Sequence, residues 1–139
     1  MIKAMESAPG SMCTTHAPNA QAAMRKLVSC AMESGPQITA ELATLKLADC
    51  VDVIVQMHLE VQRGGHGGSA RRVRYVSEII AVTPGEEAKG YAFTHVFSHR
   101  KGHGAVAHIL PDHLRDLDEF GFDAEAFHTE ARGGWGGAR

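Results

Sequence analysis

The hydrophobic period of the chain switches from helical to two-residue at Val51, and this switch constrains the fold most. From Val51 to Val61 apolar side chains alternate with polar ones, and only Ile54 interrupts the alternation. A period of two is typical of a strand with one buried face, because successive side chains point to opposite faces of a sheet. The pattern predicts a half-buried strand preceded by helices, which places the chain in the α/β class.

More strands are expected after this one. Residues 71–82 are rich in Val, Ile and Tyr, and residues 91–97 form the next such run. The glycine-rich residues 62–70 and the turn former Thr83-Pro84-Gly85 separate these runs. Connections rich in turn formers join antiparallel neighbours, so the strands are predicted to form an antiparallel meander.

Helices are expected before the strands. From Ala20 to Met32, apolar residues recur at the spacing of one helix face, and Gly35-Pro36 is a typical helix stop. A second helix is predicted to begin near Thr39, whose hydroxyl can cap it. Its buried face is expected to contain Leu42, Leu45 and Ala48.

The character of the sequence changes after His99, which divides the chain into residues 1–99 and 100–139. Residues 100–104 are expected to be a linker. Beyond them, a short helix that carries Leu114, Leu117 and Phe120 should end at Gly121, and Asp123 should cap one more turn. The second region is therefore predicted to be a weakly ordered helical tail.

Composition narrows the classes of function. The chain has 139 residues, of which 44% are hydrophobic, and a formal net charge of -2. This length allows one modest core, and the charge argues against nucleic-acid binding, which favours basic proteins. Neither a membrane-length apolar run nor a signal peptide is evident, so a cytoplasmic protein is expected. Cys13, Cys30 and Cys50 are interpreted as buried thiols, since their odd number and wide spacing do not suit a disulfide framework.

The segment Gly10-Ser11-Met12-Cys13-Thr14-Thr15-His16-Ala17 directly precedes the first long helix. Its small and β-branched residues predict a short buried strand. Ligands of α/β sheets bind beyond the carboxyl ends of strands, which makes His16, Thr14 and Thr15 candidate ligand contacts. From the residues alone, a histidine that caps the helix or packs in the core is the more common situation.

Gly10-Ser11-Met12, Thr14, His16-Ala17 and Asn19 resemble the histidine box of the secretion and pilus-assembly ATPases, in particular the CpaF type of tight-adherence (Flp) pili and related type II/IV secretion motors. Residues 1–7 resemble the end of the helix that precedes this box in the family. The later helices and the hairpin that starts at Arg71-Arg72-Val73 also fit. The resemblance covers roughly residues 1 to 98 and is most specific in its first third.

The resemblance implies the C-terminal half of a RecA-like P-loop ATPase fold over residues 1–99. It implies a motor that hydrolyses ATP with Mg2+ to power pilus assembly or protein secretion. Such motors are homo-oligomers, hexameric in the family, that dock on an inner-membrane platform protein; they are cytoplasmic or peripheral at the inner face of the membrane. Carried over to this sequence, the nucleotide contacts are Gly10, Ser11, Thr14, Thr15 and His16, with His16 as the catalytic contact to the γ-phosphate.

The sequence departs from the family in one essential motif. These motors hold phosphates in a glycine-rich loop that ends in Gly-Lys-Ser/Thr, and no such loop is present. Residues 64–69 are glycine-rich but contain no lysine. The chain is therefore expected to be inactive alone and to complete a nucleotide site with other sequence. The alternatives are a non-catalytic interaction module that docks on a motor or pilus platform, and an inactive truncated gene product.

The other clusters of polar residues give weaker indications of a functional site. His95, His99 and His103 recur every four residues, but in a strand four residues span about 13 Å, too far for a shared metal. No metal site is therefore assigned. Arg63, Arg71, Arg72 and Arg74 flank the glycine-rich turn and are interpreted as solvated charges, with contact to a phosphate or an acidic partner as the alternative.

Overall fold

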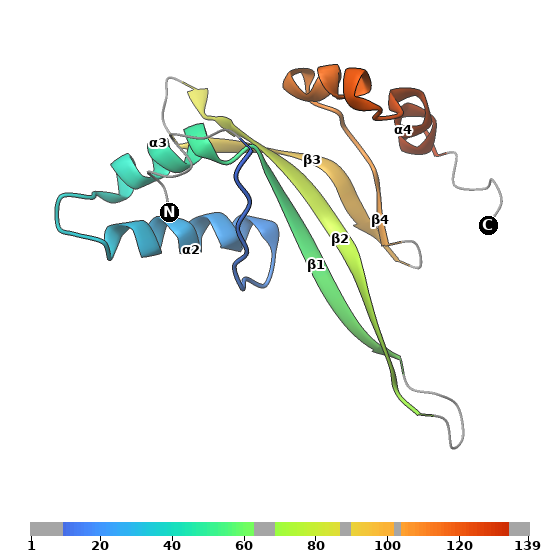
Figure 1. Cartoon of the computed structure of the whole chain (residues 1–139), viewed down its shortest axis with the longest axis horizontal. Coiled ribbons are helices and arrows are strands. Elements are labelled where there is room, and N and C mark those ends of the chain that lie inside the picture. The colour runs from blue at the N-terminus through green and yellow to red at the C-terminus, as the bar shows by residue number, and fades with distance from the viewer. Residues whose placement is uncertain (1–9, 63–68, 87–89, 102–103, 134–139) are drawn as a thin grey trace. The chain divides into compact units, whose positions relative to one another are not determined.

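The fold is seen in a computed structural model that describes residues 10–62, 69–86, 90–101 and 104–133. The chain is a mixed α/β protein with a four-stranded sheet in the order β1-β2-β3-β4 (Figure 1). The elements are α2 (Ala20–Met32), α3 (Ala40–Cys50), β1 (Val53–Gln62), β2 (Arg71–Pro84), β3 (Tyr91–Arg100), β4 (Gly104–Ala107), the 3-10 helix η2 (Asp112–Phe120) and α4 (Ala124–Ala131). The sequential strand order confirms the predicted antiparallel meander.

The fourth strand is an element that the sequence did not predict. Arg100 is the last residue of β3, and Gly104 begins β4, where a linker was expected. β4 pairs antiparallel with β3, with Phe97 opposite Ala107 and Arg100 opposite Gly104. Four residues give too short a pattern to show a period of two, so only the pairing with β3 reveals the strand.

By contacts the chain divides into two compact units, and the first contains residues up to Ile54 together with Ile80–Thr94. In this unit α2 packs against α3. Met24, Leu47, Val51 and Val82 form its buried cluster, and partly buried side chains pack around them. The helix pair thus supplies a core of the kind that the apolar spacing of α2 predicted.

Both predicted helix starts are confirmed. Asn19 Oδ1 accepts a hydrogen bond from the Ala22 amide at 2.7 Å, and Thr39 Oγ1 accepts one from the Leu42 amide at 3.2 Å. These caps satisfy amides that have no partner within the helix. The predicted buried face of α3 is only partly right. Ala48 is buried as expected, but Leu42 is exposed, and the other buried positions are Ala43 and Leu47.

The second unit contains Val55–Ile79 and His95–Arg139. Here α4 packs against β4, and the buried Phe127 meets Phe97 edge to face with ring centroids 5.2 Å apart. Gly121 ends η2 at a φ of 91°, which favours glycine, and Asp123 Oδ1 caps α4 through the Ala126 amide. The predicted stop and cap are therefore confirmed.

Burial differs from the prediction in two places. The strand predicted from Val51 is present as β1, but its apolar alternate residues are exposed rather than buried. Cys13 and Cys30 are exposed as well, and Cys50 is half-buried, so the interpretation as buried thiols is wrong for the first two. In each case the residue type suggested burial, but a covering element decides it.

Candidate functional site

The segment that contains His16 is not a strand. Residues 11–17 lie outside every helix and strand, and their side chains are exposed except for the half-buried Ala17. The prediction of a short buried strand here is therefore wrong. Small and β-branched residues form a strand only when a neighbour takes up their backbone hydrogen bonds, and the described sheet consists of β1 to β4.

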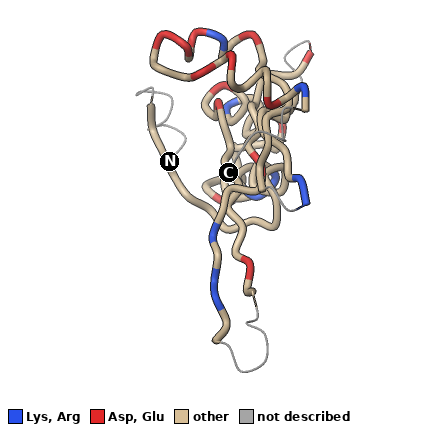
Figure 2. The backbone as a smooth tube through the Cα atoms, turned by 90° about the vertical axis from the view of Figure 1, so that its right-hand side faces the viewer, with Lys and Arg blue, Asp and Glu red and all other residues tan. Residues whose placement is uncertain are grey.

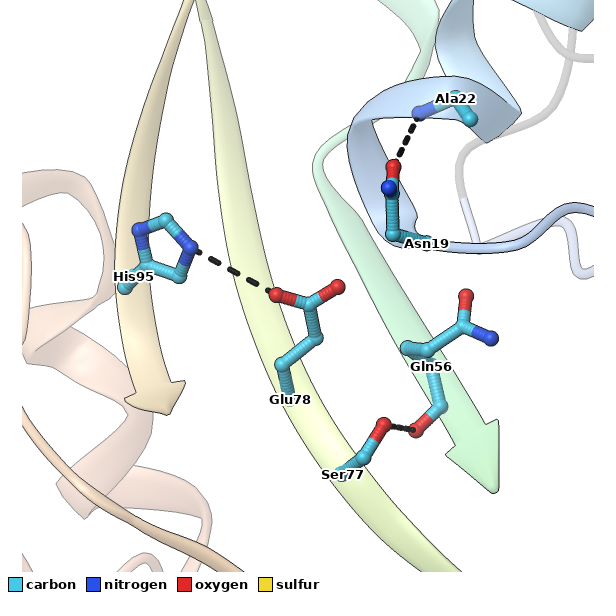
Figure 3. Close-up of polar contacts among 6 residues, drawn as sticks. All are labelled: Asn19, Ala22, Gln56, Ser77, Glu78 and His95. Atoms are coloured by element: carbon cyan, nitrogen blue, oxygen red, sulfur yellow. Dashed lines mark hydrogen bonds and ion pairs between the residues drawn. The ribbon is translucent and has the colours of Figure 1, made fainter. Parts of the chain in front are cut away.

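His16 is nevertheless held by its main chain. Lys26 on α2 reaches back across ten residues, and its Nζ donates a hydrogen bond to the His16 carbonyl at 2.8 Å. Three residues after His16, Asn19 caps α2 through the Ala22 amide (Figure 3). The backbone is therefore anchored on the helix, while the imidazole remains exposed to solvent.

The other predicted nucleotide contacts belong to the same exposed segment. Thr14 and Thr15 are exposed, and their hydroxyls are accessible as hydrogen-bond donors. Ser11 is also exposed, but it already takes part in another interaction. Gly10 has a φ of 84°, in the left-handed region that side chains disfavour, although a Cβ there would meet nothing within 4 Å. Glycine therefore suits this position because of the backbone conformation, and not because a neighbouring group lies too close to admit a side chain.

This segment can offer hydrogen bonds and one titratable ring to an anionic ligand. It does not enclose a ligand, because its polar side chains lie on an exposed surface. Within the described ranges, His, Cys, Asp and Glu side chains do not gather in groups of three or more that could hold a metal ion.

The histidines of the sheet make contacts that the sequence did not predict. In the second unit, the His58 and Tyr75 rings lie 5.3 Å apart, and Tyr75 and His99 stack at 6.3 Å. His95 Nε2 lies 3.5 Å from Glu78 Oε2 (Figure 3). His103 falls outside the described residues. Residues far apart in sequence make these pairs, so strand order was needed to find them.

The arginines that flank the glycine-rich turn lie at the start of β2. Arg71, Arg72 and Arg74 are exposed there. In Figure 2 the backbone beside the grey loop shows blue stretches of Lys and Arg that are interrupted by tan. Arg63 and the glycine-rich residues 64–68 fall outside the described residues. The exposure agrees with the interpretation as solvated charges, and it leaves contact with a phosphate or an acidic partner as the alternative.

In the part of the chain that the structure describes, the helices lack the combination of length and apolar character needed to cross a membrane. Comparisons with protein-family models, curated proteins and solved structures gave no match.

Proposed function

We propose that this chain is the part of a secretion or pilus-assembly ATPase that presents His16 to the γ-phosphate side of a bound ATP. The resemblance of residues 10–19 to the histidine box suggests this role. The observation that carries it is the combination of an exposed imidazole with a main chain fixed by Lys26 ahead of the capped helix α2. A ring held in this way can meet a ligand without first ordering its own backbone.

The chemistry proposed for His16 is stabilisation of charge. During hydrolysis, negative charge shifts over the γ-phosphate oxygens and the leaving oxygen, and a placed hydrogen-bond donor lowers the energy of that state. An imidazole N–H can be such a donor. The hydroxyls of Thr14 and Thr15 are proposed as further donors to the same phosphate.

The rest of the nucleotide site must come from elsewhere. The sequence has no Gly-Lys-Ser/Thr loop, and the described residues bring no acidic cluster to His16 that suits Mg2+. We therefore place ATP binding and Mg2+ in a complete motor, a cytoplasmic homo-oligomer that docks on an inner-membrane platform. The chain alone should release phosphate from ATP at the background rate.

The test is a fusion of this chain behind a matching half that carries the phosphate loop. His16→Ala should lower kcat about a hundredfold, which corresponds to about 3 kcal/mol. The Kd for ATP should change little, because one hydrogen bond is a small part of the total affinity. His113→Ala, which changes an exposed histidine of η2, is the matched control and should leave kcat unchanged. An unchanged kcat in His16→Ala would contradict the proposal.

A non-catalytic interaction module is the second candidate. The exposed apolar alternate residues of β1 favour it, because solvent-exposed apolar strands mark interaction surfaces. The His16→Ala variant distinguishes the two candidate functions. An interaction module should still bind its partner in this variant, whereas a motor should lose ATP turnover.

A further inference from the structure

The edge strand β1 has backbone groups that point away from the sheet. The carbonyl of Asp52 accepts a hydrogen bond from the Val82 amide, and the carbonyl of Gln56 accepts one from Ser77 Oγ (Figure 3). The carbonyls at these even-numbered positions therefore face β2. The carbonyl of Met57 instead accepts from the side-chain amide of Gln56 at 3.2 Å. Because strand carbonyls alternate in direction, the odd-numbered residues of β1 turn their backbone groups to the free edge.

The same odd-numbered residues carry the apolar side chains. We call them the β1 stripe, and they are exposed by 40% to 55%. On the opposite face of the strand, His58 contacts the Tyr75 ring. An edge strand is normally protected by charge, a proline or a covering element, and here the stripe offers apolar area and hydrogen-bonding groups together. The stripe consists of Val53, Val55, Met57, Leu59 and Val61.

A strand suits this edge better than a helix. A helix laid across the β1 stripe would cover the side chains but would not hydrogen-bond to the outward N–H and C=O groups of β1. An added strand bonds to those groups and sets its own side chains beside the stripe. The occupant is therefore an extended segment with apolar residues at every second position.

We infer that the occupant is a second copy of this chain, whose β1 pairs antiparallel about a two-fold axis at Met57. In this register Met57 faces Met57 of the second copy, and Val55 faces Leu59. Val53 faces Val61, so the whole β1 stripe is paired with itself in hydrogen-bonded positions. A two-fold interface requires such self-complementarity.

Charges agree with this register. On the polar face of β1, Gln56 lies opposite His58 of the second copy, and Ile54 lies opposite Glu60. No carboxylate therefore meets another carboxylate across the pair. Arg71 and Arg72 flank the C-terminal end of β1, and antiparallel pairing places the arginines of the two copies at opposite ends of the interface. Like charges directly opposite each other would destabilise the pair, and this register avoids them.

Sedimentation velocity of the purified full chain over a range of concentrations tests the pairing. We expect a reversible dimer in the wild type. Met57→Lys and Met57→Glu should each raise the dimer dissociation constant at least tenfold, because each puts two like charges face to face. An equimolar mixture of the two variants should restore the dimer through opposite charges. Met12→Lys changes a methionine that is 95% exposed outside β1, and it should leave the constant unchanged.

Cysteine substitutions test the register. Paired residues in hydrogen-bonded positions have Cα atoms about 5.5 Å apart, within reach of a disulfide. Met57→Cys should therefore form a covalent dimer on mild oxidation. Leu59→Cys should not crosslink with itself, because two such residues would lie about 13 Å apart along the strands. A mixture of Leu59→Cys with Val55→Cys should crosslink. The wild type, with its native cysteines, gives the background.

Several results would overturn the inference. A wild type that stays monomeric at every concentration refutes it, and so does a monomer that binds a different protein through β1. A dimer that Met57→Lys leaves intact places the interface elsewhere. Circular dichroism of each variant excludes unfolding as the cause of a monomer. His16→Ala lies outside β1 and should leave the dimer unchanged, so this inference and the nucleotide proposal can fail independently.

Discussion

The buried core of the first unit and the β1 stripe are built from similar residues with opposite burial. Met24, Leu47 and Val82 are almost completely buried in the first unit. Met57 and Leu59 of the β1 stripe are half exposed. Residue type therefore does not separate the two regions. The two regions differ in which elements pack over them. The core residues lie between two helices and a sheet, whereas the stripe lies on an edge strand.

The comparison separates two roles for an apolar side chain. A buried side chain contributes to the stability of the chain, because folding removes its area from water. A half-exposed one keeps much of that area available for association with a partner. Substitutions in matched residue pairs test this difference, since the chemistry of the change is then the same and only burial differs.

The largest effect is expected for Phe127→Ala. Phe127 is 4% exposed and packs against Phe97, so truncation should lower the free energy of unfolding by about 3 to 5 kcal/mol. Phe120→Ala, at a site that is 84% exposed, is the matched control and should change it by less than about 0.5 kcal/mol. Urea unfolding followed by circular dichroism measures both. An equal loss of unfolding free energy in the two variants would mean that the exposed fraction of a side chain does not predict the effect of its truncation.

The pair Leu47 and Leu59 compares the two regions directly. Leu47→Ala removes a side chain that is 0% exposed and should cost about 2 to 5 kcal/mol. Leu59→Ala, at 47% exposure, should cost well under half as much stability but should weaken the dimer. Urea unfolding gives the first quantity, and sedimentation gives the second. A stability loss in Leu59→Ala as large as that in Leu47→Ala would show that the β1 stripe is covered within one chain.

A smaller effect is expected at the helix caps of the first unit. Asn19→Ala removes the acceptor for the Ala22 amide and should cost about 1 kcal/mol. Thr39→Ala removes the longer bond to the Leu42 amide and should cost no more than Asn19→Ala. Thermal unfolding of the two variants against wild type checks the order. A larger loss for Thr39→Ala would contradict the ranking by bond length.

The smallest effect on stability is expected for His16→Ala. The side chain is exposed, and the bond from Lys26 goes to the backbone carbonyl, which alanine keeps. The free energy of unfolding should change by less than about 0.5 kcal/mol. A loss of several kcal/mol in urea would indicate a structural histidine instead of a ligand contact.

Local patterns in the sequence predicted most elements. The helical spacing from Ala20, the cap residues Thr39 and Asp123, and the stop at Gly121 need only neighbours in the chain, so each can be read from a short window. The strand starting after Val51 follows from a period of two. The RecA-like half and the roles of the nucleotide contacts remain predictions that rest on the resemblance.

By itself, the sequence determined where α2, α3, α4 and the strands β1 to β3 form, because caps, stops and periods act over a few residues. Only the tertiary structure decided which of them are covered. It left residues 11–17 outside every helix and strand, joined β4 to β3, and left the β1 stripe exposed. Burial and strand pairing depend on residues that are distant in the chain, and a local pattern carries no information about whether such a neighbour is present.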